Sequence, residues 1–209
     1  MKSSYIIEFN NHTKKDFEDV WQIESCYFDP STISSINKVM EWDNKNNDTN
    51  ILIRNEKLNK IVGEITMLPL SKKQFDDFIL NTFEDTELDA KNLLVYEDNN
   101  TYYLLFSAIA IDKNYRSDKS VLSFLLKGIN IKINELLKRG IKFENMCAEG
   151  QTPDGQKFAE SFLNLKEKNI SKKGYKIYCF DSKIEMDKWI NIFPSYIDKY
   201  DSILKKESE

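Results

Sequence analysis

The stretch that decides the fold begins with Tyr102-Tyr-Leu-Leu-Phe-Ser-Ala-Ile-Ala-Ile111 and ends at Arg139. Its first part is apolar almost throughout, and a run of this length without polar alternation is typical of a strand covered on both faces. The polar turn Asp112-Lys-Asn-Tyr-Arg-Ser-Asp118 follows, and Gly140 comes directly after Arg139, as at the end of a helix. The stretch therefore predicts a buried strand, a tight turn and a long amphipathic helix. The apolar positions of that helix recur every three or four residues: Leu122, Leu125, Ile129, Ile133 and Leu136.

The junction between this strand and this helix is a candidate anion site. The N–H groups in the first turn of a helix have no partner within the helix, and the helix dipole is positive at this end. Both features favour a negatively charged ligand such as a pyrophosphate. After the helix, Phe143-Glu-Asn-Met-Cys-Ala148 has the pattern of another strand. A strand–helix–strand connection predicts that the two strands are parallel.

The rest of the chain alternates between strand-like and helix-like patterns. Pro69 is expected to end the strand before it, because proline cannot extend a ladder of backbone hydrogen bonds, and Pro194 is expected to kink or divide the last helix. The segment 69–101 is expected to be an insertion in a domain of residues 1–180, with residues 181–209 as a C-terminal helical extension. The expected strands are 5–9, 51–55, 61–68, 165–170 and 175–180, and further helices are expected to begin near residues 14, 31, 71, 152 and 186.

Composition places the chain among globular proteins with one sizeable domain. Of the 209 residues 41% are hydrophobic, and no apolar run reaches the ~20 residues that cross a bilayer. The 3 cysteines, Cys26, Cys147 and Cys179, are far apart and lie in apolar contexts, which indicates reduced, buried thiols. The first residues lack the pattern of a signal peptide. These observations predict a cytoplasmic protein without a membrane partner.

The ionisable residues exclude several function classes. His12 is the only histidine, so neither a histidine-based metal site nor a catalytic triad with a histidine base is expected. The net charge of -4 and the dispersed lysines argue against nucleic acid as a partner. The acidic segment from Glu84 to Asp89 either borders a cleft, where it would attract a cationic ligand, or forms a solvated loop.

Two segments and the order of the elements carry a resemblance to a known family. Ala108-Ile-Ala-Ile-Asp-Lys-Asn-Tyr-Arg116 looks like that family's hydrophobic strand leading into a turn with an arginine, and Ile61-Val-Gly-Glu-Ile65 looks like the strand before it. Together with the element order over about residues 5–180, they resemble the GNAT N-acetyltransferases. The resemblance implies an α/β fold with a mixed central sheet flanked by helices.

The co-substrate of this family is acetyl-CoA, and the resemblance assigns its two halves to different residues. The pantetheine arm would pair with the backbone of the central strand, and the phosphates would lie on the following loop and helix start. The sequence departs from the family at that loop, because Lys119 and Val121 stand where glycines are usual and Asp118 adds a negative charge. The residues assigned to the arm are Ile109, Ala110 and Ile111, and those assigned to the phosphates are Arg116, Ser117, Asp118, Lys119, Ser120 and Val121.

The activity that the resemblance implies is direct transfer of an acetyl group from acetyl-CoA to a primary amine of a small molecule or a peptide, without a metal. Glu64 is the candidate catalytic residue, as a general base: it is a carboxylate within an apolar strand, and it faces either a cleft or solvent. A tyrosine is a frequent general acid in the family, but Glu160 stands at the matching position. Ser107, a polar residue in the central apolar run, marks either a bulge or a buried hydroxyl.

A second interpretation stands beside the first, namely a catalytically weak or inactive GNAT-like module that binds acyl-CoA or a partner. The missing glycines and the missing tyrosine favour this module. The intact central strand and Arg116 favour the enzyme. The apolar stripe of the last helix, which includes Trp189 and Phe193, either packs on its own chain or forms a homodimer contact.

Overall fold

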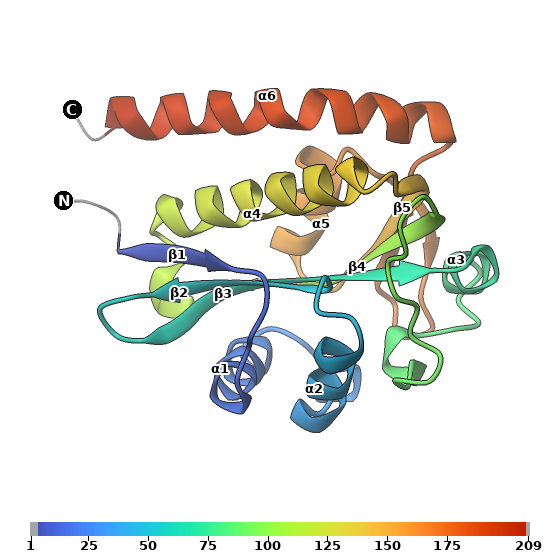
Figure 1. Ribbon diagram of the computed structural model, residues 1–209, viewed down its shortest axis with the longest axis horizontal. Helices are drawn as coiled ribbons and strands as arrows, with labels where there is room; N and C mark the ends of the chain where they lie inside the picture. The colour runs from blue at the N-terminus through green and yellow to red at the C-terminus, as the bar shows by residue number, and fades with distance from the viewer. Residues whose placement is uncertain (1–3, 208–209) are drawn as a thin grey trace.

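This computed structural model describes residues 4–207, and side chains are described for residues 4–202. Its strands form one mixed sheet. The strand order is β1-β2-β3-β4-β5-β7-β6, and neighbouring strands are antiparallel except β4 and β5, which are parallel (Figure 1). The predicted α/β class and the parallel pair around the long helix are confirmed. The strands are β1 (Tyr5–Glu8), β2 (Asn50–Asn55), β3 (Lys60–Leu70), β4 (Thr101–Ile111), β5 (Lys142–Gly150), β6 (Lys166–Ile170) and β7 (Lys176–Cys179).

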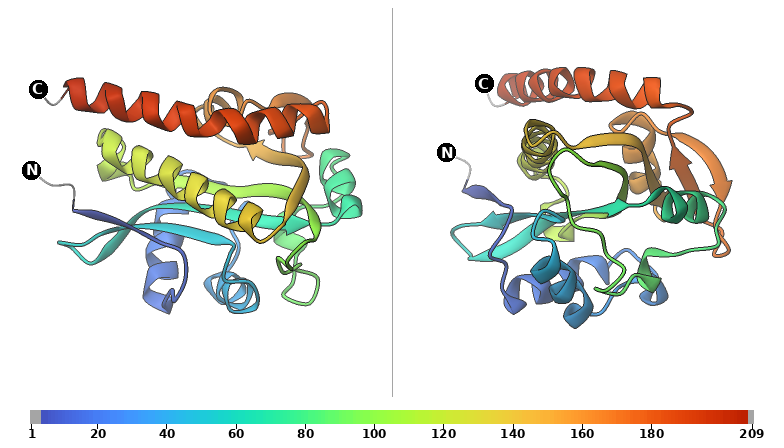
Figure 2. Two further views of the ribbon diagram at one scale, coloured as in Figure 1. Left: turned by 45° about the horizontal axis from the view of Figure 1, so that its top comes forward. Right: turned by 45° about the vertical axis from the view of Figure 1, so that its right-hand side comes forward.

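Helices cover both faces of this sheet, as Figure 1 and Figure 2 show. α1 and α2 lie on one face, α4 and α5 lie on the other, and α6 packs outside α4 and against β5. The division of the chain into a domain at 1–180, an insertion at 69–101 and an extension at 181–209 stays a prediction. The α-helices are α1 (Lys14–Glu24), α2 (Ile36–Lys45), α3 (Lys72–Ile79), α4 (Lys119–Lys138), α5 (Pro153–Ser161) and α6 (Lys183–Glu207), and short 3-10 helices are η1 (Pro30–Thr32), η2 (Asp85–Glu87) and η3 (Lys113–Tyr115).

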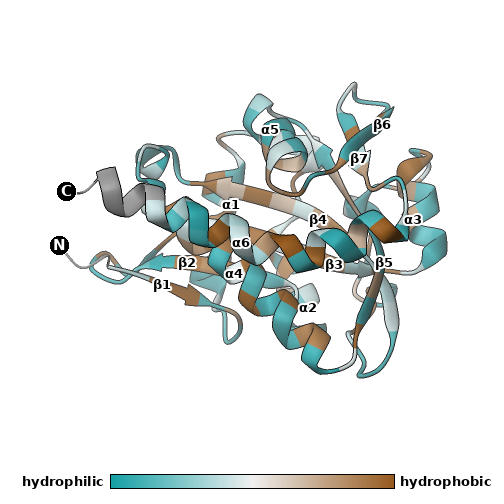
Figure 3. Cartoon of the chain, turned by 90° about the horizontal axis from the view of Figure 1, so that it is seen from above, coloured by the Kyte–Doolittle hydropathy of each residue, from teal (hydrophilic) through white to brown (hydrophobic). Residues whose placement is uncertain are grey.

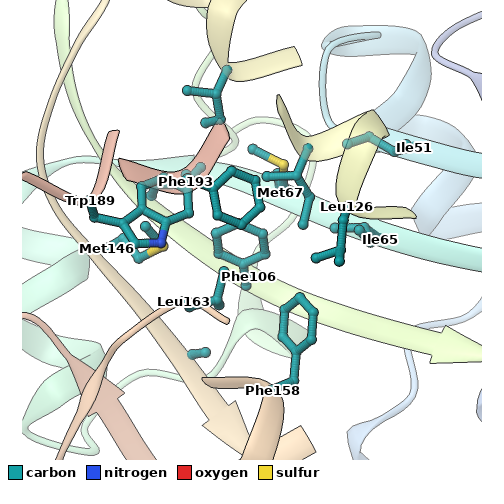
Figure 4. Close-up of a cluster of buried hydrophobic side chains, with 14 of the residues drawn as sticks. Ile51, Ile65, Met67, Phe106, Leu126, Met146, Phe158, Leu163, Trp189 and Phe193 are labelled. Carbon is teal, nitrogen blue, oxygen red and sulfur yellow. The ribbon is translucent and has the colours of Figure 1, made fainter. Parts of the chain in front are cut away.

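The alternation of side chains along the strands divides the core between the two faces. Successive residues of a strand point to opposite faces, so Ile51 and Ile53 join the cluster beneath α4 while Leu52 joins the one beneath α1. Gly128 lets α4 approach the sheet closely, because a Cβ at this position would lie 2.6 Å from Cγ2 of Ile51. Figure 4 shows the larger cluster, in which Phe106 of β4 lies near its centre.

Side chains that cap the helices explain where several helices begin and end. Thr13 and Asp16 form a capping box at the start of α1, which supplies partners for two backbone N–H groups. Asp118 caps α4 by accepting a hydrogen bond from the backbone of Ser120. Gly140 follows α4 with a φ of 77°, a left-handed conformation that ends a helix at little cost in a glycine.

Two prolines do not have the predicted effect. β3 continues through Pro69 to Leu70, although Pro69 was expected to end the strand. Beyond Thr66, β3 has lost its pairing with β2 and keeps only its pairing with β4, so the missing N–H of Pro69 can face an unpaired edge. α6 likewise runs as one helix through Pro194 and is not divided there. α6 packs along α4, and whether Pro194 kinks it stays a prediction.

The second helix and one cysteine also differ from expectation. α2 begins at Ile36 and not near residue 31, because Asp29 caps the short helix η1 and Ser35 then caps α2 separately. Cys147 and Cys179 are buried as predicted, but Cys26 is exposed. The helices are amphipathic, with brown and teal residues mixed along α4 and α6 in Figure 3. Within residues 4–207, none of them has both the length and the apolar character that crossing a membrane requires.

Candidate functional site

The two parallel strands at the centre of the sheet diverge at one end. Pairing between β4 and β5 runs from Thr101 to Phe106 on β4 and stops there, although β4 continues to Ile111. β3 stays paired with β4 as far as Ile111, and β5 pairs with β7 beyond the point of divergence. In the part of the chain that the structure describes, one edge of β4 from residue 107 to 111 therefore has no strand beside it. Such an edge offers backbone N–H and C=O groups to an extended ligand.

A β-bulge marks the point of divergence. Thr66 lies opposite Ala108 and Met67 lies opposite Phe106, so Ser107 has no partner residue on β3. The extra residue bends the strand and redirects the side chains around it. The Ser107 hydroxyl donates a hydrogen bond to the carboxylate of Asp85 in η2. Of the two alternatives for Ser107 in the sequence, the bulge is confirmed.

A cavity of about 70 Å³ lies at the divergence of the strands. One wall is apolar and continuous with the main core, and it includes Phe106, Phe158 and Leu163, which Figure 4 shows side by side. The other wall is polar. Among the described residues, the ionisable side chains that line the cavity are all carboxyls, and no lysine, arginine, histidine or tyrosine lines it. These carboxyls come from four separate elements: Glu24, Glu64, Asp85 and Glu149.

Glu64 faces the cavity from β3. Its neighbour Ile65 belongs to the cluster beneath α4, so strand alternation turns Glu64 to the opposite face, toward α1. It lies opposite Ala110 of β4, is only 1% exposed, and has no hydrogen-bond partner for Oε1. Burial and then the neighbouring Glu24 carboxyl raise the pKa of Glu64 well above its usual value. The sequence allowed Glu64 to face either a cleft or solvent, and in the structure it lines the cavity.

Glu24, the last residue of α1, shares this environment with Glu64. Burial raises the pKa of Glu24 to about 7, with a further contribution from the charge of Asp85, while the hydrogen bond with Glu64 acts in the opposite direction. Two carboxyls in contact are most stable when one is protonated and donates to the other. Near neutral pH the pair can therefore take up one proton or give it away.

Asp85 and Glu149 extend the acidic wall away from this pair. Burial raises the pKa of Asp85, and the hydrogen bond from Ser107 counteracts that rise. Burial also raises the pKa of Glu149, to which the charge of Asp85 contributes. Gln151 donates from Nε2 to Oε1 of Glu149 over 3.1 Å. Although the cavity holds several carboxyls, no group of three or more potential ligands within the described residues is arranged to hold a metal ion.

The start of α4, where the sequence predicts a phosphate site, is held by protein groups. Oδ1 of Asp118 accepts from the backbone N–H of Ser120 at 2.9 Å, and Oδ2 accepts from the hydroxyl of Tyr5 at 2.6 Å. Val121 is fully buried, and a Cβ added at Gly63 would lie 3.1 Å from its Cγ1. The first turn of α4 therefore already has a carboxylate at its positive end.

Arg116 is also engaged within the protein. Its guanidinium forms an ion pair with Asp154 in the first turn of α5 and lies 5.3 Å from the centre of the Tyr27 ring. Because Arg116 follows β4 and Asp154 follows β5, the pair connects the two sides of the divergence. Both side chains are more than half exposed, so this ion pair is weak.

The structure brings some of the predicted site residues together and separates others. Glu64 lies directly across from Ala110, and Ile109 lines the cavity with Glu64. The residues from Arg116 to Val121 form a second region around the start of α4. Glu160 lies outside the cavity, where its Oε1 accepts from the hydroxyl of Tyr178 at 3.0 Å. The catalytic and cofactor roles of these residues stay predictions.

Sequence reasoning did not identify three of the four carboxyls as site residues. Glu24 fits the helical pattern of α1 and gives no signal of its own. Glu149 ends a strand that carries other polar residues. Asp85 belongs to the acidic segment that was considered as a possible border of a cleft, and it does line the cavity. A signal existed only for Asp85, as part of a local cluster of acidic residues.

Comparison with known proteins gives matches in structure and not in sequence. No protein-family model and no curated protein sequence matches this chain. The chain is similar to Ard1 from Thermoplasma volcanium, with 10% identity, a TM-score of 0.52, and coverage of 84% of this chain and 95% of that one. It is similar to the NatC complex bound to Gag peptide and CoA, with 9% identity, a TM-score of 0.53, and coverage of 84% and 95%.

A third similar structure is the loading GNATL domain of CurA from Lyngbya majuscula. The identity is 13%, the TM-score is 0.57, and the match covers 85% of this chain and 97% of that domain. At such low identity the likeness concerns the fold. The mixed sheet with divergent central strands, the helices on both of its faces and these matches show that the chain has the GNAT N-acetyltransferase fold.

Proposed function

We propose that this protein transfers an acetyl group from acetyl-CoA to a primary amine. The observation that carries the proposal is the position of a buried carboxyl pair, Glu64 and Glu24, beside the unpaired edge of β4. The edge supplies hydrogen-bonding groups for an extended thioester ligand, and the pair supplies a proton acceptor. These are the two elements that amine acylation needs.

The co-substrate would bind along the unpaired edge. Its pantetheine arm carries amide groups that can pair with the backbone of residues 109–111 as an added strand does. The thioester oxygen would then accept from a backbone N–H near the bulge at Ser107, which stabilises the negative charge that develops during attack. One protein of the same fold, the NatC complex, was determined with CoA bound, which supports a CoA ester as donor.

The reaction itself balances with one proton released. The acceptor enters as an ammonium ion, and a carboxylate of the Glu64–Glu24 pair takes its first proton. The amine nitrogen then attacks the thioester carbonyl carbon, a C–N bond forms, and the C–S bond breaks. The second proton of the nitrogen goes to the leaving sulfur, so that the products are the acetylated amine, CoA as a thiol, and one proton on the carboxyl pair.

The phosphates of the co-substrate would lie at the start of α4, near Ser117, Lys119 and Ser120. The carboxylate of Asp118 stands at this helix end and repels them, since two like charges about 4 Å apart in water repel by about 1 kcal/mol. We therefore infer that affinity comes chiefly from the arm and its contacts with β4.

Thermal unfolding tests the donor, and release of free thiol tests the transfer. Acetyl-CoA at ~100 times its Kd should stabilise the fold by about 2.7 kcal/mol, a rise in Tm of roughly 5 to 10 °C for a chain of this size. Free CoA and ATP serve as controls for the arm and for the phosphates. A shift with acetyl-CoA, together with amine-dependent thiol release, supports the proposal. The absence of any shift at millimolar acetyl-CoA contradicts it.

A further inference from the structure

The acidic wall of the cavity is longer than deprotonation of one amine requires. Glu64 and Glu24 already provide a proton acceptor, yet Asp85 and Glu149 line the same cavity. An adjoining hollow continues past them and shares several lining residues with the cavity, namely Thr32, Asp85, Phe106, Ser107, Glu149 and Gln151. The two spaces thus form one groove with carboxyls along its length.

Buried carboxylates without cations are unfavourable, which points to a cationic ligand. Of the described residues that line the first cavity, none carries a positive charge. Lys38 and Lys173 lie outside this lining, and their charges act on Asp85 and Glu149. Oε1 of Glu64 is buried and lacks a hydrogen-bond partner, so one strong acceptor is directed at the space a ligand would fill. Burial of unpaired charge costs several kcal/mol unless a counter-charge or a hydrogen-bond donor is supplied. An ammonium group supplies both.

The carboxyls form two groups at different positions along β4. Glu64 lies opposite Ala110, with Glu24 beside it. Asp85 accepts a hydrogen bond from Ser107 of β4, and Glu149 lies on the neighbouring strand β5. Three residues along a strand correspond to about 10 Å, and both groups line the same cavity. Two ammonium groups joined by a chain of about four to six carbons would match this separation.

We propose that the acceptor is a flexible α,ω-diamine whose second ammonium is held by Asp85 and Glu149 while its first amine meets Glu64. The inference rests on the proposed acetyl transfer and deepens it by naming the substrate class. It also predicts which acceptors bind poorly. An acceptor with its own carboxylate is repelled by the acidic wall, and a monoamine brings no ammonium group to the second group of carboxyls.

The test compares acceptors of equal length. We expect kcat/KM for 1,4-diaminobutane and 1,6-diaminohexane to exceed that for butylamine by about ten- to a hundredfold, the usual range for one hydrogen bond to a charged group. Asp85→Asn and Glu149→Gln should each remove most of this preference, so that the ratio of the diamine and butylamine values of kcat/KM falls toward one. Asp89→Asn is the matched control, because Asp89 is exposed in the same segment and does not line the groove.

Calorimetric binding of the same amines, in the presence of free CoA, separates the two proposals. Preferential binding of diamines that is lost in Asp85→Asn, without any acetyl transfer, supports the dication site and overturns the proposed activity. Acetylation of butylamine as efficiently as of the diamines supports the activity and overturns the dication site. Equal losses for monoamines and diamines in a folded Asp85→Asn variant also overturn the dication site, since Asp85 would then act on the reaction as a whole.

Discussion

Two neighbouring regions of the chain differ in whether their polar groups have partners within the protein. They are the edge of β4 between Ser107 and Ile111 and the start of α4. The edge of β4 is unpaired on one side and borders a cavity with an unsatisfied carboxyl oxygen on Glu64. At the start of α4, Asp118 accepts two hydrogen bonds and Arg116 is paired with Asp154. In the first region a buried oxygen has no partner within the described residues, whereas in the second Asp118 and Arg116 are partnered by groups of the protein itself.

The two regions show that the same fold can leave polar groups unsatisfied at one position and satisfy them with its own side chains at the next. A carboxylate at a helix N-terminus replaces the favourable effect that a bound phosphate would have there. Val121 is buried against Gly63 and contributes to the core beneath α4. Asp118 and Val121 thus have structural roles at the start of α4, and the buried carboxyl with an unsatisfied oxygen lies beside the β4 edge.

The largest effect is expected from Glu64→Gln in the cavity. This change keeps the shape of the side chain and removes one carboxyl of the pair that shares and accepts the proton, so kcat/KM for amine acetylation at pH 7 should fall by about a hundredfold. Thiol release measures it. Glu56→Gln is the control, because Glu56 is an exposed glutamate in the turn after β2. A loss of less than about threefold in Glu64→Gln would place the base elsewhere.

The second effect is a dependence of stability on pH that originates in the same carboxyl pair. Burial raises the pKa of Glu24 to about 7 from a usual 4.5, so the folded protein binds more protons than the unfolded chain between these values. The contribution is therefore complete below about pH 4.5 and is lost as pH rises through 7, with a total of roughly 3 kcal/mol. Urea unfolding from pH 5 to pH 8 measures it.

Glu24→Gln provides the comparison for this pH dependence. The variant has no titrating group at this position, so its free energy of unfolding should fall less over the same pH range. The difference between the two proteins should grow steadily with pH. If the free energy of unfolding depends on pH in the same way in wild type and Glu24→Gln, the carboxyl pair does not titrate in this range. The β4 edge would then not differ from the start of α4 by a titrating pair.

The smallest effect is expected at the start of α4. Asp118→Asn keeps a good helix cap and removes the negative charge, so the affinity for acetyl-CoA should rise by about fivefold, which corresponds to about 1 kcal/mol. Titration calorimetry at low salt measures it, and salt should reduce the gain. Asp154→Asn, which releases Arg116, should have a smaller effect of the same sign. Weaker binding of acetyl-CoA by Asp118→Asn would contradict this prediction, since the carboxylate would then contribute to binding and not repel the phosphates.

Much of the fold could be predicted from local pattern. The apolar run of β4 and the periodic helix α4 identified the central unit, and the parallel partner β5 followed from the connection between them. The end of β3 was misplaced because Pro69 lies where β3 no longer pairs with β2, which the local sequence does not show. The predicted division of the last helix at Pro194 was wrong, since α6 continues through it. The start of α2 was misplaced because Asp29 and Ser35 each cap a separate helix.

The site was less accessible to prediction than the fold. Glu64 could be identified because a carboxylate within an apolar strand is unusual in itself. Glu24, Asp85 and Glu149 are ordinary acidic residues at a helix end, in a loop and at a strand end. Only their convergence on one cavity makes them unusual, and the residues between Glu24 and Glu149 span more than half of the chain.

Local sequence pattern was enough to predict the class of fold, the central strand and helix, and Glu64 as an unusual carboxylate in an apolar strand, because hydrophobic periodicity and strand alternation act between near neighbours. Only the tertiary structure decided where β4 and β5 separate, which carboxyls meet there, and that Asp118 and Tyr5 occupy the start of α4. The physical reason is that electrostatic and desolvation energies depend on distances through space. Those distances are set when helices pack on both faces of the sheet.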